Sequence, residues 1–186
     1  MTDRERNPWK ILSEKNMYEN RWINITEFDV INPGGGKGIY GKVHFKNLAI
    51  GILVLDENMN TYLVGQYRFP LNEYSWEIPE GGGDLNIPPV ESAKRELLEE
   101  TGLVANEWKE LLRIHLSNSV TDELAIIFLA RGLEQRSPIP EETEELTVKK
   151  LAFEDAYQMV KNGSITDGMS VAAIQKMKLT LLEQSQ

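Results

Sequence analysis

GGGDLNIPPVESAKRELLEETGL, from Gly81 to Leu103, is the stretch that decides the fold. Its three leading glycines predict a turn. Pro88 and Pro89 are typical of the first positions of a helix, and Gly102 is typical of the residue that follows a helix. The stretch therefore predicts a glycine-rich turn, a helix of about three turns and a sharp stop at Gly102.

Three carboxylates share one arc of this predicted helix. At about 100° per residue, Glu96, Glu99 and Glu100 lie together, and apolar residues from Val90 to Leu97 face a core on the neighbouring arc. Like charges at this spacing destabilise a helix, and negative charge near a helix C-terminus opposes the macrodipole. A solvated acidic face is one interpretation. A bound divalent cation is the other, favoured here because it turns both costs into a ligand set.

The same residues resemble a known family. Gly81 followed by Arg95 to Leu103, in the pattern Gly…Arg-Glu-Leu-x-Glu-Glu-x-Gly-Leu, is similar to the Nudix box of pyrophosphohydrolases. Ile87 departs from the pattern, because the family usually has a glutamate there that braces the loop and the helix through the box arginine. Glu91, one helical turn before Arg95, is our candidate for that brace.

The resemblance implies a metal site and a set of ligands. Mg²⁺ is the expected ion, with Mn²⁺ as a substitute, and Glu96 and Glu100 are the expected ligand pair. Glu99 reaches a further ion, and the backbone carbonyl of Glu80 completes the set. Arg95 belongs to the expected catalytic group together with Glu96.

The acidic segment Pro140 to Leu146 resembles the loop that carries the general base in ADP-ribose pyrophosphatases. By its distance from the following strand, Glu142 matches the base and Glu144 matches a supporting contact to metal or water. The alternative is a charged surface loop without a catalytic role.

Three residues outside the box are candidates for substrate binding: Arg68, Trp22 and Tyr40. Arg68 follows a buried strand and suits a bidentate phosphate contact, and a surface salt bridge is the alternative. In the ADP-ribose branch, aromatic residues at places matching Trp22 and Tyr40 sandwich the adenine, including residues from two subunits. Packing in the core or at an interface is their alternative. Asn118 stands where that branch has a proline, which widens the expected substrates to other nucleoside diphosphate sugars.

The composition of the chain narrows the possible classes of function. The chain has 186 residues and a net charge of −9, which argues against nucleic acid as the main partner. It has no cysteine, so disulfides and thiol chemistry are excluded. The start, Met1 to Asn7, has no apolar segment typical of a signal peptide, and apolar runs such as Leu48 to Leu55 are of strand length. We expect a cytoplasmic protein without membrane contact.

The expected elements describe an α/β protein. Strands are predicted at 9–20, 21–30, 39–45, 49–55, 61–67, 75–78, 110–115, 124–130 and 146–151, and helices from Phe153 to Gly163 and from Asp167 to Leu182. The strands at 49–55 and 61–67 are expected to form a buried hairpin. The pattern favours a mixed sheet between helices, and the resemblance implies the Nudix α/β/α sandwich. Residues 1–46 are expected to form an antiparallel extension for dimerisation and for part of the nucleotide pocket, and residues 47–186 the hydrolase domain.

The resulting hypothesis is a Mg²⁺-dependent Nudix hydrolase that cleaves nucleoside diphosphate sugars. ADP-ribose comes first, yielding AMP and ribose 5-phosphate, and GDP-mannose is a further candidate. A homodimer is the expected assembly. The alternatives are a nucleoside triphosphate pyrophosphohydrolase of housecleaning type and a non-catalytic sensor of nucleotide sugars.

Overall fold

The computed structural model describes residues 6–136 and 145–184. Contacts between residues divide the chain into two compact units. The N-terminal unit comprises residues 1–47 together with 117–123, and the larger unit comprises residues 48–116 and 124–186. A loop from the middle of the chain therefore belongs to the N-terminal unit.

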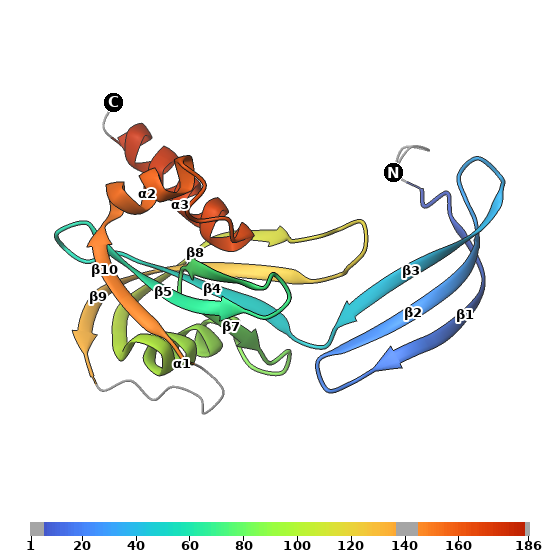
Figure 1. Ribbon diagram of the computed structural model, residues 1–186, viewed down its shortest axis with the longest axis horizontal. Helices are drawn as coiled ribbons and strands as arrows, with labels where there is room; N and C mark the ends of the chain where they lie inside the picture. The colour runs from blue at the N-terminus through green and yellow to red at the C-terminus, as the bar shows by residue number, and fades with distance from the viewer. Residues whose placement is uncertain (1–5, 137–144, 185–186) are drawn as a thin grey trace. The chain divides into compact units, whose positions relative to one another are not determined.

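The N-terminal unit is built on a three-stranded antiparallel sheet in the order β1-β2-β3 (Figure 1). Its strands are β1 (Lys10–Glu19), β2 (Ile23–Ile31) and β3 (Lys37–Phe45). The segment 117–123 attaches to β3 through hydrogen bonds from Val43 N to Val120 O at 2.9 Å and from Asp122 N to Val43 O at 3.3 Å. The ring of His44 adds a contact of 2.8 Å to the Asp122 carboxylate, which gives this histidine a structural partner.

The larger unit contains two sheets. The first has the order β7-β4-β9-β8, formed by β4 (Leu48–Val54), β7 (Glu80–Gly83), β8 (Leu103–His115) and β9 (Leu124–Gln135). It is a mixed sheet, because β4 and β9 are parallel whereas β7 and β8 pair antiparallel to them. The second sheet has the order β10-β5-β6 and is antiparallel; its strands are β5 (Asn60–Arg68), β6 (Glu73–Glu77) and β10 (Thr147–Ala152).

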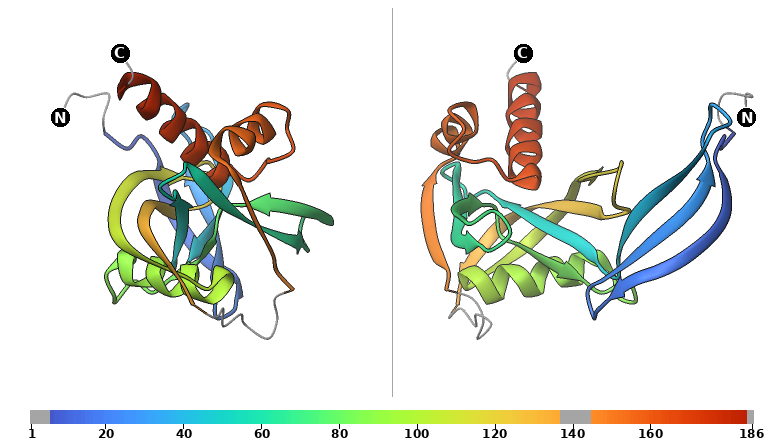
Figure 2. Two further views of the ribbon diagram at one scale, coloured as in Figure 1. Left: turned by 90° about the vertical axis from the view of Figure 1, so that its left-hand side faces the viewer. Right: turned by 45° about the vertical axis from the view of Figure 1, so that its right-hand side comes forward.

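Helices cover both faces of the mixed sheet, as the views in Figure 2 show. Helix α1 (Pro89–Thr101) packs on one face through Ala93 and Leu97, against alternate residues of β4 and β9 such as Ile50. Helices α2 (Phe153–Lys161) and α3 (Gly168–Gln184) pack on the other face. The expected α/β/α sandwich with a mixed sheet and an antiparallel extension is confirmed.

The ends of α1 follow from local chemistry. Pro89 occupies the first turn, where its missing N–H is no loss. Gly102 takes a left-handed conformation with φ of 70° and donates its N–H to the carbonyl of Leu98. Both ends lie where the sequence predicts them. Among the described residues, no helix is both long and apolar enough to cross a membrane.

Two sequence predictions are wrong. Gly81 to Gly83 form strand β7 and not a turn, because they pair with β4 from Leu48 to Ile50. The strands β4 and β5 do not form a hairpin with each other. They belong to different sheets, because β4 pairs with β7 and β9 whereas β5 pairs with β6 and β10.

Candidate functional site

Four elements of the larger unit place acidic and basic side chains close together. They are the acidic arc of α1, strand β7, the end of β5 with the facing strand β6, and the residue before α3. Strand β7 lies beside α1 because it pairs at the edge of the mixed sheet that α1 covers.

The box glutamates Glu96 and Glu100 are almost fully buried, with 9% and 4% of their surface exposed. The Glu80 backbone N–H donates to Glu100 Oε2 at 3.0 Å. Arg95 Nη2 donates to Glu96 Oε1 at 2.6 Å. Burying carboxylates is costly unless they are paired or bind a cation, so this arc is not a solvated surface.

Arg95 ties the helix to β7. Its Nη2 also donates to the carbonyl of Gly82 at 2.8 Å, and its Nη1 donates to Glu99 Oε2 at 2.7 Å. The expectation that Glu91 braces Arg95 is wrong, because Glu91 forms its ion pair with Lys94 at 2.8 Å. The brace between loop and helix runs instead from Arg95 to the strand backbone.

Gly81 is required for this arrangement by close approach. A Cβ built at position 81 would collide with the carboxylate of Glu96. The residue therefore lets the strand backbone and the box glutamate share one small space, a use of glycine that does not involve its backbone freedom.

A second group of charges adjoins the box at β5, β6 and β7. Arg68 Nε donates to Glu77 Oε1 at 2.9 Å, and its Nη2 donates to both Glu77 and Glu80. Glu77 is 3% exposed, and the side chains of Glu80 and Arg68 are 10% and 34% exposed. Burial acts to lower the pKa of Arg68, but hydrogen bonding to Glu77 and the charge of Glu80 raise it overall.

Asp167, the residue before α3, completes a cluster of three carboxylates. One oxygen each of Glu77, Glu80 and Asp167 lies within 4.8 Å of the others. The N–H of Ser170 donates to Asp167 Oδ2 at 2.7 Å, and the Ser170 hydroxyl accepts the N–H of Ile78 at 2.8 Å. These bonds fix the start of α3 against the segment that leads into β7.

Glu80 has the most perturbed environment of the cluster. Burial, followed by the charges of Asp167 and Glu77, raises the pKa of the Glu80 carboxyl well above its ordinary value, although Arg68 acts in the opposite direction. Its Oε2 atom is buried and has no hydrogen-bond partner among the described residues. A buried acceptor without a partner is costly and suits a cation that is bound in function.

The donor set fits a hard divalent cation. Mg²⁺ and similar ions take carboxylate and carbonyl oxygens, and this site gathers several carboxylates with an unsatisfied oxygen on Glu80. Glu77 and Asp167 were not singled out from the sequence. The sequence offered one sign for Glu77, because the alternation of side chains along β6 places it on the inward face with Ser75. A glutamate is rarely buried unless it has a partner, so an inward glutamate indicates a paired or functional group. Asp167 was predicted only as the first residue of a helix.

The structure brings Glu80, Glu96, Glu99, Glu100, Arg95 and Arg68 into this region. Glu142 and Glu144 lie outside the described residues. Trp22 and Tyr40 lie in the N-terminal unit and are not neighbours within one chain. Tyr40 pairs with Phe28 on the neighbouring strand. Phe28 follows Trp22 by six residues, which separates the two by about 20 Å along an extended strand.

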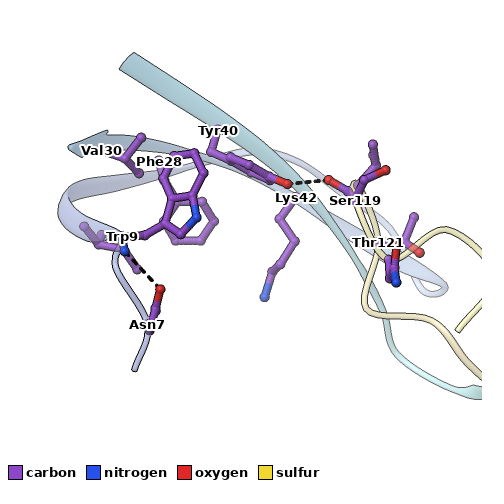
Figure 3. A pocket seen from close by; sticks show the side chains of 11 residues that line it. Asn7, Trp9, Phe28, Val30, Tyr40, Lys42, Ser119 and Thr121 are labelled. Carbon is purple, nitrogen blue, oxygen red and sulfur yellow. Dashed lines mark hydrogen bonds between the residues drawn. The ribbon is translucent and has the colours of Figure 1, made fainter. Parts of the chain in front are cut away.

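Tyr40 lines a pocket of about 380 Å³ within the N-terminal unit (Figure 3). Its ring packs edge-on against Trp9 at 5.3 Å, and its hydroxyl donates to the carbonyl of Ser119 at 2.5 Å. Phe28 and Lys42 also line the pocket. The sequence did not single out Trp9. Trp22 does not line this pocket, and the Arg21 guanidinium lies 4.0 Å from its ring centre.

Comparison with known proteins decides the family. The model of the NUDIX domain matches residues 45–168, and the model of the nucleoside diphosphate sugar hydrolase N-terminal domain matches residues 9–43. The chain belongs to the Nudix family. The resemblance given by the box residues is thus confirmed, and this Nudix hydrolase carries the N-terminal domain of the sugar-nucleotide branch.

The relatives of this chain agree with this branch. An ADP-ribose pyrophosphatase of Mycobacterium tuberculosis is 29% identical over 89% of this chain and 81% of its own length. A GDP-mannose pyrophosphatase of Enterobacter sp. is 31% identical over 92% of this chain and 95% of its own length. The crystal structure of an ADP compounds hydrolase superposes with a TM-score of 0.84 at 20% identity, covering 95% of both chains, and supports the fold.

Proposed function

We propose that this Nudix hydrolase cleaves the diphosphate of nucleoside diphosphate sugars with Mg²⁺ as its resident ion, and that ADP-ribose is its first substrate. The products are then AMP and ribose 5-phosphate. The observation that carries the proposal is the pair of buried box carboxylates, Glu96 and Glu100, beside the partly buried cluster of Glu77, Glu80 and Asp167. The relatives' names support the substrate class.

Glu96, Glu100 and the carbonyl of Glu80 are the residues that would hold the ion, with Glu99 available for a further one. When bound, the ion neutralises phosphoryl oxygens and lowers the pKa of a water molecule. Mn²⁺ is the expected substitute, because it accepts the same oxygen ligands. The Glu80 carboxylate offers an additional oxygen through its unpartnered Oε2.

Arg68 and Arg95 position the acidic groups. Arg95 holds Glu96 and Glu99 against the carbonyl of Gly82, which orients the box. Arg68 neutralises Glu77 and Glu80 and keeps a third of its side chain exposed, enough to meet a substrate phosphate. A guanidinium suits this double task because its donors lie in a fixed planar fork.

Glu142 is our candidate for the general base, on the strength of the family resemblance of its segment. A general base contributes typically 10²–10⁴-fold, so Glu142→Gln should lower kcat by about that factor with little change in KM. Glu144→Gln and Glu145→Gln are the matched variants. If one of these loses kcat while Glu142→Gln keeps it, the base is the neighbour. If all three retain kcat, this segment does not supply the base.

For the N-terminal unit, we propose that the pocket around Trp9 and Tyr40 takes the nucleobase. Two aromatic rings and a volume of about 380 Å³ suit a flat ring system. Trp9→Ala should then raise KM for ADP-ribose without lowering kcat. Trp22→Ala is the comparison, because Trp22 remains a candidate from a second subunit and lies outside this pocket.

We also propose a homodimer that forms through the N-terminal sheet. Among the strands of this sheet Val30 alone is fully buried, whereas Ile11, Leu12 and Ile39 are 53–68% exposed. Native sheets rarely leave such apolar residues and edges uncovered. Light scattering at micromolar concentration should give twice the monomer mass, and Ile39→Glu should reduce it. A fully active monomer would contradict the proposal.

A substrate panel tests the function and separates its alternatives. ADP-ribose, GDP-mannose, UDP-glucose and nucleoside triphosphates are each incubated with the enzyme and Mg²⁺, and the products are quantified by chromatography. Nucleoside monophosphate from the sugar nucleotides supports the proposal. Pyrophosphate from the triphosphates alone indicates a housecleaning enzyme. Tight binding of sugar nucleotides without any product indicates a sensor.

A further inference from the structure

A second cavity lies in the larger unit, on the face of the mixed sheet that carries α3. It has a volume of about 480 Å³ and is lined by residues of β8, β9 and α3 (Figure 1 shows α3 in red). Leu111, Leu129 and Met177 give it an apolar wall, which continues the core cluster beneath α2 and α3. The acidic residues of the candidate active site do not line it. Its volume is in the range of small-molecule sites.

Three cationic side chains line this cavity: Lys109 from β8, Arg131 from β9 and Lys176 from α3. Positive charge is scarce in this acidic protein, which has 20 lysines and arginines against 29 aspartates and glutamates. Within the described part of the larger unit, the cations that make no ion pair or ring contact with a described residue are Lys109, Arg131, Arg136 and Lys176. Three of these four therefore meet at one cavity.

Arg131 makes the strongest case for a ligand. Its Nε atom is buried and has no hydrogen-bond acceptor among the described residues. Buried guanidinium donors are ordinarily satisfied, and a missing acceptor calls for an explanation. An anionic ligand that lies against this guanidinium in the cavity would supply the opposite charge that no described residue gives Arg131.

The acidic residues of the lining do not cancel this charge. Glu110 is already bound by Arg113 through two contacts of 2.7 and 2.8 Å. Glu107 stands opposite Arg131 in the strand pairing and lines the cavity, yet no hydrogen bond or ion pair joins its carboxylate to Arg131. The cavity thus presents three cations against one free carboxylate.

We propose that this cavity binds a small organic phosphate ester, with the phosphate on Arg131, Lys109 and Lys176 and its apolar portion on Leu111, Leu129 and Met177. A phosphate dianion matches several cations better than a carboxylate, and the guanidinium fork suits its oxygens. The proposal concerns a site separate from the box glutamates, and binding there needs no metal ion.

The test uses phenyl phosphate, which joins a phosphate to an apolar ring, and isothermal titration calorimetry of the full chain in excess EDTA. EDTA removes the ions on which substrate binding at the box depends. We expect one molecule bound per chain, with affinity falling as ionic strength rises. Inorganic phosphate, which lacks the ring, should bind at least tenfold more weakly.

Charge variants locate the site. Arg131→Gln and Lys176→Gln should each weaken phenyl phosphate at least tenfold, whereas Glu107→Gln should tighten it, because it removes the opposing charge. Arg136→Gln is the matched control, since Arg136 is also unpaired among described residues but does not line the cavity. The affinity of Arg136→Gln for phenyl phosphate should stay within twofold of that of the unmodified protein.

Several results would overturn the proposal. One is that millimolar phenyl phosphate does not bind in EDTA. Another is that Lys176→Gln and Arg136→Gln lose the same affinity for phenyl phosphate, and a third is that binding needs Mg²⁺. Inorganic phosphate that binds as tightly as phenyl phosphate would refute the apolar part. Lys176 lies on the exposed side of α3, so Lys176→Gln decides the matter even if Arg131→Gln does not fold.

Discussion

The carboxylate of Glu96 lies against the Cα of Gly81, in the space that any side chain at position 81 would occupy. Gly81 does not have a positive φ, so the requirement for glycine here is steric and not conformational. The contact joins the edge strand β7 to the acidic arc of α1. It therefore sets the position of a box glutamate relative to the Glu80 backbone.

We predict that Gly81→Ala impairs catalysis more than it impairs folding. The added methyl must push Glu96 or β7 aside, and a shift of about 1 Å can cost about 10²-fold in rate. Steady-state kinetics and a thermal melt would measure the two effects. Gly38→Ala is the control, because nothing lies within 4 Å of a Cβ built there. Activity of Gly81→Ala within threefold of Gly38→Ala would show that the contact is not critical.

We predict that Mg²⁺ raises the melting temperature and that Glu100→Gln removes this effect. An ion that binds the folded state at 100 times its Kd adds about 2.7 kcal/mol to the unfolding free energy. Glutamine keeps the shape and can still accept the Glu80 N–H, so the fold should survive. The metal effect should also weaken on acidification, because ligand carboxylates must be deprotonated. An unchanged melting shift in the variant would remove Glu100 from the ligands.

We predict that Arg68→Ala destabilises the metal-free protein in addition to raising KM. It leaves Glu77 and Glu80 buried without their cation. Removing one partner of a buried pair costs about 3–5 kcal/mol, and the lower end applies because Arg68 is 34% exposed. Arg113→Ala, which breaks an exposed pair with Glu110, should cost less than about 1 kcal/mol. Equal urea midpoints for the two variants would contradict this account of the cluster.

We predict a pH-dependent contribution from Asp56. Burial acts to raise the pKa of this carboxyl, but hydrogen bonds from Lys150, Asn60 and Asn58 outweigh it and hold the pKa well below its ordinary range. A lowered folded-state pKa stabilises the fold above the unfolded pKa of about 3.9, and the contribution declines as the pH falls below it. Asp56→Asn should therefore cost about 1.5–3 kcal/mol at pH 7 and clearly less at pH 3.

Urea unfolding at both pH values measures the Asp56 effect. Glu57→Gln is the control, since this neighbouring carboxylate is exposed in the same turn and should change stability little at either pH. If Asp56→Asn loses the same unfolding free energy at pH 3 and at pH 7, the ionised carboxylate is not the source of the stability.

The parts of this protein that local chemistry determines were predictable from the sequence. The ends of α1 follow from Pro89 and Gly102, and the arc of Glu96, Glu99 and Glu100 follows from helical geometry. The parts that depend on distant pairing were not predictable. Gly81 to Gly83 look like a turn in isolation and become a strand because β4 offers a partner.

The candidate site shows the same division. Glu77 and Asp167 are 90 residues apart and meet because β6 and the start of α3 approach the same end of β7. No pattern of spacing along the sequence predicts that two such distant residues lie close together. Trp9 was likewise passed over, since its partner Tyr40 reaches it only through the pairing of three strands.

The most direct test of the account is the Mg²⁺-dependent release of AMP from ADP-ribose by the unmodified chain, Glu100→Gln and Glu91→Gln, measured by chromatography. Glu91 lies on the same helix but is exposed and paired with Lys94. The account predicts Mg²⁺-dependent AMP from the unmodified chain and from Glu91→Gln. It predicts none above background from Glu100→Gln, whose melting temperature without metal should match that of the unmodified chain. Near-normal turnover by Glu100→Gln at saturating Mg²⁺ would contradict it.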